Sequence, residues 1–82
     1  MSKSIYDARH VALVEILIEK RKEAGIRQVD LAKAVGKQQS FVARLESGQR
    51  RIDVVDLIKF GELLDFDPIE VIKDIMTISE PS

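Results

Sequence analysis

The chain lacks cysteine and tryptophan, and it has a single histidine among its 82 residues. Without cysteine there is no disulfide framework and no thiolate metal site, and a reducing compartment is the default expectation. No second histidine and no carboxylate cluster at metal-ligand spacing accompany His10, so we expect it to be a solvated helix residue. The sequence therefore predicts no metal site.

Motifs of catalysis are also missing. Ser40 and Ser47 have no nucleophile elbow around them and no second histidine to activate them. The four glycines are spread singly along the chain and form no phosphate-binding loop. We expect a protein that is not an enzyme, holds no cofactor and has no evident small-molecule ligand.

No long apolar run is present. The longest apolar cluster, residues 11–18, is interrupted by Glu15 and is far too short to span a bilayer. No uncharged apolar segment follows the first four residues, so a signal peptide is not expected. The sequence predicts a cytoplasmic protein without membrane contact.

The residues that are present describe a globular chain. Hydrophobic residues make up 45% and charged residues 33%, and the length predicts one domain, residues 1–82. The formal net charge of -1 is unusual for a nucleic-acid-binding domain, but the distribution of charge matters more than the sum. Residues 33–51 hold five cations against Glu46 alone, whereas residues 52–82 hold eight acids and two lysines. We expect one positive end that can approach a polyanion.

Helix-forming stretches and their punctuation predict an all-α fold. The five expected helices cover residues 5–24, 28–35, 39–47, 54–64 and 68–76. Gly25 and Gly48 are expected to end helices as C′ glycines. Asp53 and Asp67 are expected to begin helices as N-caps. Two other helix starts, at Arg27 and Gln38, lack a short acceptor side chain, so weak caps are expected there.

Helical spacing of apolar residues predicts the core. The expected core positions of the first and fourth helices are Leu13, Val14, Leu17 and Ala24, then Val54, Leu57, Ile58, Phe60 and Leu64. Gly61 lies inside the fourth helix, where it costs about 1 kcal/mol relative to alanine. That cost suggests a close helix–helix approach at Gly61.

Two helices have more apolar surface than a single packing partner requires. The first is apolar around most of its circumference, which indicates either deep embedding or a share in a dimer interface. The last carries two stripes on nearly opposite sides: Ile69, Ile72 and Met76, and Val71, Ile75 and Ile78. We expect the first stripe to close the core and the second to form a homodimer interface. The alternative is a C-terminus that simply folds back.

Residues 25–48 have the pattern of a helix-turn-helix. Two short helices flank a turn marked by Gly36, and each has one apolar side. The exposed side of the second of these helices carries Gln39, Ser40 and Arg44, which are residue types that read base edges.

From Leu17 to about Ile72 the chain resembles the Cro/repressor-like, or XRE, family of helix-turn-helix DNA-binding proteins. The matching residues are Arg21, Gly25-Ile26, Gln28, Asp30-Leu31-Ala32, Gly36, Gln39-Ser40-Phe41-Val42, Arg44-Leu45-Glu46, Gly48, Arg50-Arg51, Leu57, Leu63-Leu64 and Asp67-Pro68. The resemblance implies a compact five-helix, lambda-repressor-like domain that binds operator DNA as a homodimer, with the third helix in the major groove.

The resemblance also implies roles for individual residues. The expected base contacts are Gln38, Gln39, Ser40 and Arg44, and the expected phosphate contacts are Arg27, Gln28, Lys37, Arg50 and Arg51. Glu46 is expected to pair with a cation such as Arg21 inside the fold. The expected function is a sequence-specific regulator of transcription, such as a small repressor of the Cro type or a controller protein of a restriction–modification system. An antitoxin that represses its own operon is the alternative.

Overall fold

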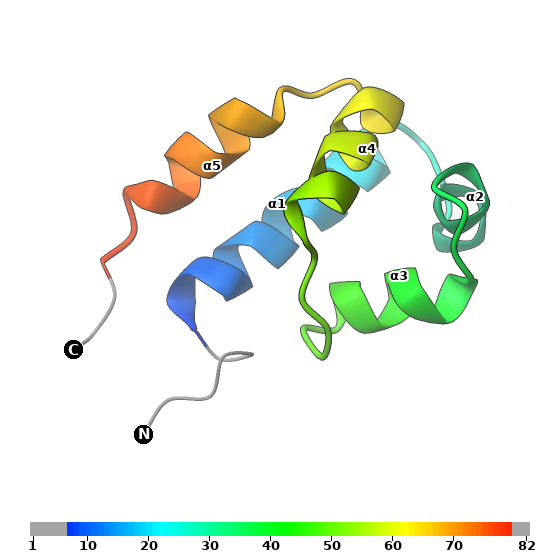
Figure 1. Ribbon diagram of the computed structural model, residues 1–82, viewed down its shortest axis with the longest axis horizontal. Helices are drawn as coiled ribbons and strands as arrows, with labels where there is room; N and C mark the ends of the chain where they lie inside the picture. Colours follow the sequence, from blue (N-terminus) through cyan, green and yellow to red (C-terminus); the bar gives the residue numbers. More distant parts are fainter. Residues whose placement is uncertain (1–6, 80–82) are drawn as a thin grey trace.

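The structure is a computed structural model that describes residues 7–79. This part of the chain forms five helices and no strand: α1 (Ala8–Glu23), α2 (Gln28–Ala34), α3 (Gln39–Glu46), α4 (Val54–Leu64) and α5 (Pro68–Met76) (Figure 1). The all-α fold with five helices is thereby confirmed. Within residues 7–79, no helix combines the length and the apolarity that crossing a bilayer requires.

The helix ends follow local capping chemistry. α1 begins at Ala8 because the Asp7 carboxylate accepts a hydrogen bond of 2.9 Å from the backbone N–H of Arg9. The start predicted at residue 5 lies outside the described residues. Each of the first three helices ends one residue before its predicted end, since the residues predicted to be last are the C-caps: Ala24, Val35 and Ser47. α4 and α5 have the predicted bounds, and Asp53 and Asp67 cap them as expected.

The core lies where α1, α2, α3 and α4 meet. Its most deeply buried large side chains are Leu17, Leu31, Val42, Leu45 and Phe60. Three positions predicted to be buried are instead exposed: Ala24, Val54 and Ile58. Ala24 follows the last turn of α1, beyond the packed part of the helix.

Val54 and Ile58 lie on a flank of α4 rather than on its buried side. The buried side is set by Leu57, Phe60 and Leu64, which recur at helical spacing. Val54 and Ile58 are offset from these residues around the helix and are 60% and 45% exposed. The fourth helix therefore has a narrower buried stripe than its composition suggests.

A tight corner joins α4 to α5 at Gly61. A Cβ atom at this position would lie 2.8 Å from the backbone oxygen of Phe66 and 3.0 Å from Cδ of Pro68. The Phe66 N–H also donates a 3.0 Å hydrogen bond to the Gly61 oxygen. The predicted close approach at Gly61 is confirmed, although its main neighbour is the turn between the helices and not a facing helix.

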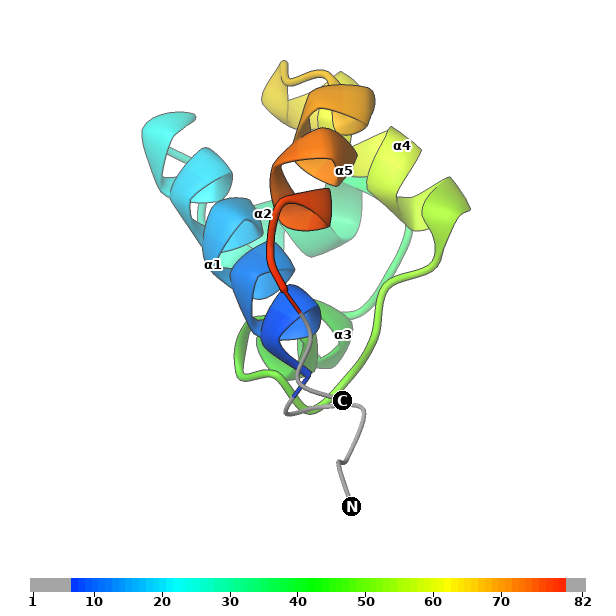
Figure 2. The ribbon, with the colours of Figure 1, turned by 90° about the vertical axis from the view of Figure 1, so that its left-hand side faces the viewer.

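α5 packs alongside α1, as both views of the ribbon show (Figure 1, Figure 2). The expectation that the stripe of Val71, Ile75 and Ile78 is exposed is wrong. Val71 is 3% exposed and Ile75 and Ile78 are half-buried, whereas Ile69 and Met76 are 60% and 64% exposed. The Val71 stripe faces α1, and the Arg9 Nε–H donates a 2.9 Å hydrogen bond to the Ile78 oxygen at that same contact.

His10 is buried, which corrects the expectation of a solvated residue. It is 5% exposed, and its Nε2 atom is buried without a hydrogen-bond partner. The reason is its register on α1: His10, Val14 and Leu17 follow the i, i+4, i+7 spacing of one helix face, and that face is the buried one.

Candidate nucleic-acid interface

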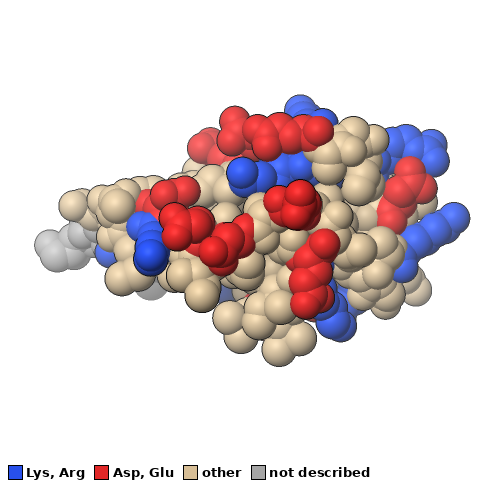
Figure 3. All heavy atoms as spheres, turned by 90° about the horizontal axis from the view of Figure 1, so that it is seen from above, with Lys and Arg blue, Asp and Glu red and all other residues tan. Residues whose placement is uncertain are grey.

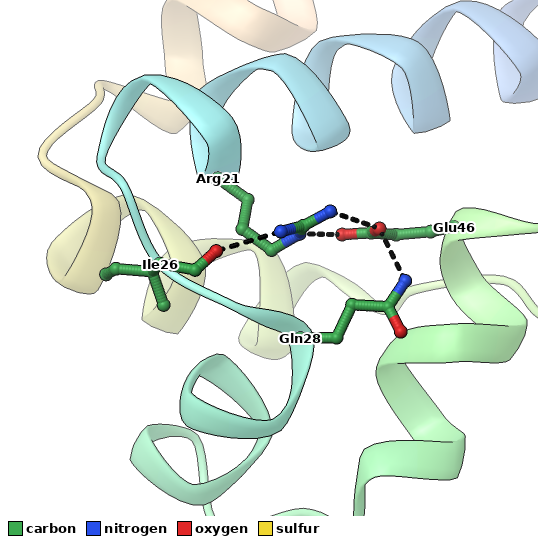
Figure 4. Close-up of polar contacts among 4 residues, drawn as sticks. All are labelled: Arg21, Ile26, Gln28 and Glu46. Carbon is green, nitrogen blue, oxygen red and sulfur yellow. Dashed lines mark hydrogen bonds and ion pairs between the residues drawn. The ribbon is translucent and has the colours of Figure 1, made fainter.

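Glu46 is the centre of a polar network that joins the first three helices (Figure 4). The Arg21 Nε–H donates to Glu46 Oε2 at 2.6 Å and its Nη2–H donates to Oε1 at 3.0 Å. Arg21 Nη1–H also donates to the Ile26 oxygen at 2.8 Å, which ties α1 to the segment before α2. The predicted pairing of Glu46 with Arg21 inside the fold is confirmed.

Gln28 belongs to the same network. Its Nε2–H donates a 2.9 Å hydrogen bond to Glu46 Oε1, so the start of α2 is fixed to the end of α3 (Figure 4). In this structure the Gln28 amide nitrogen is used inside the protein. A phosphate contact by Gln28 therefore stays a prediction. Gln28 would have to make that contact while keeping its hydrogen bond to Glu46.

The packing of α3 decides which of its side chains face outward. Phe41, Val42 and Leu45 are buried against the core. Because these positions occupy one side of the helix, Gln39, Ser40 and Arg44 lie on the other, and all three are exposed. Gln38, immediately before the helix, is exposed as well.

Neither α2 nor α3 has a side-chain cap, as predicted from Arg27 and Gln38. Arg27 reaches forward and donates hydrogen bonds of 2.9 and 3.4 Å to the two carboxylate oxygens of Asp30. The hydrogen bond from Arg27 lowers the pKa of the Asp30 carboxyl group. Both side chains lie at the surface, so water and salt screen this pair.

Two cations lie over the ring of Phe41. The Lys37 Nζ atom is 5.2 Å and the Arg50 Cζ atom 4.6 Å from its centroid. Phe41 is only 8% exposed, and its ring meets the Phe60 ring edge to face at a centroid distance of 6.5 Å. These two cations and Arg44 line a shallow hollow of about 250 Å³ together with the ring and the side chains of Gln38 and Ser40.

Acidic and basic side chains are unevenly distributed over the surface. Figure 3 looks down on the side that carries α4 and α5, and acidic side chains cross the middle of this face. Lysine and arginine side chains project at the end of this view where α2 lies, and others are scattered over the rest of this face (Figure 3). The cations of the helix-turn-helix and the loop after it are all exposed: Lys33, Lys37, Arg44, Arg50 and Arg51.

The structure thus brings most of the predicted contact residues together. One hollow collects Lys37, Gln38, Ser40, Arg44 and Arg50 from the turn, from α3 and from the loop after it. Arg27 and Gln28 lie at the start of α2, outside that hollow. In the sequence, Phe41 is recognisable only as one residue of the family motif. Its contact with Arg50 joins residues from different elements, so helical periodicity alone gives no sign of it.

Residues 7–79 contain no group of three histidine, aspartate or glutamate side chains placed to hold a metal ion.

Comparison with known proteins places this arrangement in a family. A family model described as "Helix-turn-helix" matches residues 17–71, more than half of the chain. Among solved structures, an XRE-family-like protein from Pseudomonas syringae pv. tomato is 37% identical, with a TM-score of 0.78 and 85% of each chain covered. No curated protein matches the sequence significantly.

Two further structures share the fold. The restriction–modification controller protein C.AhdI from Aeromonas hydrophila is 34% identical over 78% of this chain and 93% of its own, with a TM-score of 0.71. The clp gene regulator ClgR from Corynebacterium glutamicum is 20% identical over 84% of this chain and 73% of its own, with a TM-score of 0.75, and it supports the fold alone. The chain belongs to the XRE family of helix-turn-helix proteins and is a DNA-binding regulator of transcription, not an enzyme.

Proposed function

We propose that this protein binds a palindromic operator in double-stranded DNA as a homodimer, with α3 of each copy in the major groove. The observation that carries the proposal is the outward face of α3. Gln39, Ser40 and Arg44 are exposed together on a helix whose other side is buried, and exposed Lys37 and Arg50 lie beside it. An isolated α-helix of this width fits the major groove of B-DNA. A cytoplasmic location is part of the proposal.

The residue types of this face suit base recognition. Glutamine can pair with N6 and N7 of adenine, and arginine with O6 and N7 of guanine, each through two hydrogen bonds. We assign these roles to Gln39 and Arg44, with Ser40 and Gln38 as further base contacts. Arg44 lies in the last turn of α3 and lines the hollow beside Lys37 and Arg50, where it also adds positive charge.

The backbone contacts are assigned to the cations around this face. Lys37, Arg50 and Arg51 are all exposed on the segments that flank α3. Arg27 is exposed at the start of α2, the other helix of the helix-turn-helix, and we assign it the same role. Phosphate contacts of this kind hold the protein in register without reading sequence.

The homodimer is assigned to the exposed apolar residues of α4 and α5. Val54 and Ile58 share one flank of α4 with Gly61, and that flank turns toward α5 because Gly61 meets Pro68. Ile69 and Met76 lie on one side of α5 and are largely exposed. Val54, Ile58, Ile69 and Met76 therefore form the proposed dimer face, in place of the buried Val71. The half-buried Ile75 and Ile78 border the α1 contact and leave less surface for a partner.

Two copies are needed for a physical reason. The full chain carries a net charge of -1, so a single copy gains little from general attraction to DNA. Two copies on one duplex double the number of base and phosphate contacts. A controller protein of a restriction–modification system is the second candidate within this class, supported by the 34% identity to C.AhdI.

In-vitro selection of bound DNA tests the proposal. The full chain is incubated with a random double-stranded pool, and bound molecules are amplified over several rounds at physiological salt. We expect enrichment of an inverted repeat whose half-site centres lie about 10 bp apart, or a multiple of that. Failure to enrich any sequence would contradict sequence-specific binding. Enrichment of a single unrepeated half-site would contradict the dimer but not the reading face.

A further inference from the structure

Phe41 has contacts that neither core packing nor base recognition explains. Its ring lies in the core, edge to face with Phe60 at 6.5 Å, yet it also lies beneath the side chains of Lys37 and Arg50. Lys37 comes from the turn before α3, and Arg50 from the loop after it. One buried ring therefore contacts two cations, one from the segment before α3 and one from the segment after it.

We infer that Phe41 is a positioning residue: it holds Lys37 and Arg50 over its ring so that they form one preordered phosphate-binding site. The inference rests on the proposed function, because the phosphate is that of the DNA backbone. It explains how the long, exposed side chains of Lys37 and Arg50 are already ordered in the absence of DNA. Phe41 itself touches no DNA in this proposal.

The physics of the contact supports ordering more than simple attraction. A cation within about 6 Å of an aromatic centroid is attracted by the ring quadrupole, and both distances here fall inside that limit. Lysine and arginine lose more rotamer freedom than most residues when they are immobilised. A side chain that is already held in place loses less of that freedom on binding, so DNA affinity rises.

The surroundings of the ring also favour a phosphate as the ligand. Lys37, Arg44 and Arg50 line the same hollow, and none of its lining residues is acidic. The other polar residues of the lining, Gln38 and Ser40, are uncharged, so nothing in the hollow repels an anion. Guanidinium and ammonium groups that converge in this way suit an oxyanion.

The first test needs no DNA. Proton NMR of the free protein reports ring currents, which shift the resonances of groups that lie over an aromatic face. We expect upfield shifts for the side-chain CH₂ groups next to the Arg50 guanidinium and the Lys37 ammonium, and their loss in Phe41→Leu. Unshifted resonances for both residues in the folded wild-type protein would overturn the inference, whether or not Phe41→Leu folds.

The second test is a double-mutant cycle on the selected operator. The variants are Phe41→Leu, Arg50→Ala and the double variant, with Phe60→Leu as the matched control that removes a neighbouring core ring holding neither cation. At about 2- to 5-fold per cation, Phe41→Leu is expected to weaken binding by about tenfold in total. Phe41→Tyr, which keeps the ring, is expected to restore most of this loss.

The outcomes separate the inference from the proposed function. We expect Arg50→Ala to weaken binding less in the Phe41→Leu background than in the wild type, because the two changes remove the same arrangement. Independent effects, or an equal loss from Phe60→Leu, would overturn the positioning role while leaving DNA binding intact. If no operator is found, the proposed function fails, and the NMR result alone decides whether Phe41 holds the two cations.

Discussion

Arg21 and Glu46 are joined by hydrogen bonds of 2.6 and 3.0 Å although they lie 25 residues apart in the chain. Their side chains are only 13% and 8% exposed. An ion pair that is largely shielded from water contributes little compared with an apolar pair of the same shape, but removing one partner leaves the other charge without compensation. Here the pair also carries Gln28, so it fixes the relative placement of α1, α2 and α3.

Glu46→Gln is expected to destabilise the protein by about 3 kcal/mol. The variant keeps the shape of the side chain, but it leaves the Arg21 guanidinium without its counter-charge. Urea denaturation followed by circular dichroism measures the change. Glu23→Gln is the matched control, because the Lys20–Glu23 pair, at 4.0 Å with side chains 34% and 63% exposed, is expected to contribute less than about 1 kcal/mol.

Replacing both partners of the Arg21–Glu46 ion pair tests whether the unpaired charge causes the loss of stability. Arg21→Leu combined with Glu46→Leu removes both charges, so no unpaired charge remains in the interior. We expect the double variant to be more stable than Glu46→Gln alone. Arg21→Leu and Glu46→Leu are also made singly. If the double variant loses as much stability as the two single variants together, the two residues are not energetically coupled.

Arg44 and Arg50 are expected to differ in how they bind DNA. Arg44→Ala should weaken binding to the selected operator by about 1–3 kcal/mol and relax the preference at one base pair. Arg50→Ala should weaken binding to all sequences and reduce the magnitude of the salt slope by about 0.9. Binding titrations on operator and scrambled DNA at several salt concentrations separate the two. Equal weakening on both DNAs by Arg44→Ala would make it a phosphate contact.

The proposed dimer face gives opposite expectations for two residues of α5. Met76→Asp changes a residue that is 64% exposed, so it should produce a folded monomer. Val71→Asp places a carboxylate at a position that is 3% exposed, and it should destabilise the fold by more than about 3 kcal/mol. Sedimentation at micromolar concentration and thermal unfolding measure the two effects.

Leu63→Asp is the matched control for the dimer face. Leu63 is 41% exposed but lies away from α5, in hollows lined by residues such as Glu62 and Asp65. We expect this variant to remain a dimer. Dissociation by Leu63→Asp and not by Met76→Asp would move the interface to the other flank of α4.

Local signals in the sequence were sufficient for much of the fold. Asp53 and Asp67 accept hydrogen bonds from the residues that capping chemistry indicates, at 2.8 and 2.9 Å. Gly25 and Gly48 have φ angles of +71° and +83°, which side chains other than glycine rarely adopt. These features depend on neighbours within a few residues, so a pattern in the chain is enough to find them. The pairing of Arg21 with Glu46 came instead from the family resemblance.

The orientation of α5 was beyond such signals. Its two apolar stripes are similar in composition, and periodicity does not say which one faces the core. Which stripe of α5 faces the core depends on how α5 leaves the turn after α4. At that corner, Gly61 lies against the Phe66 oxygen and the Pro68 ring. The burial of His10 was missed for a related reason, since its polar ring indicates a solvated residue, whereas its position on the packed face of α1 buries it.

Gly61→Ala tests that corner. Helix propensity alone predicts a gain of about 1 kcal/mol, because alanine is favoured inside a helix. The added methyl group would lie 2.8 Å from the Phe66 backbone oxygen, so the turn must shift, and we expect a net loss of about 1–2 kcal/mol. Thermal unfolding gives the sign. Glu62→Ala, at the next and exposed position, controls for propensity, and a stabilised Gly61→Ala would show that the corner yields easily.

Asp30 tests whether a negative charge beside the interface limits DNA affinity. The hydrogen bond from Arg27 lowers the pKa of Asp30, so the pair favours the folded state above the unfolded pKa, and this contribution is lost as the pH falls through the folded pKa. Because both side chains are exposed, Asp30→Asn should leave Tm nearly unchanged.

The effect of Asp30→Asn on DNA should be larger than its effect on stability. The change releases Arg27 and removes a charge that repels phosphate, so operator binding should strengthen a few-fold at low salt and less at high salt. Arg27→Gln is the companion variant: NMR titration should show the Asp30 pKa returning to the ordinary aspartate range. If Asp30→Asn weakens binding instead, the ion pair itself holds the start of α2 in its DNA-binding position, and Arg27 is not a phosphate contact.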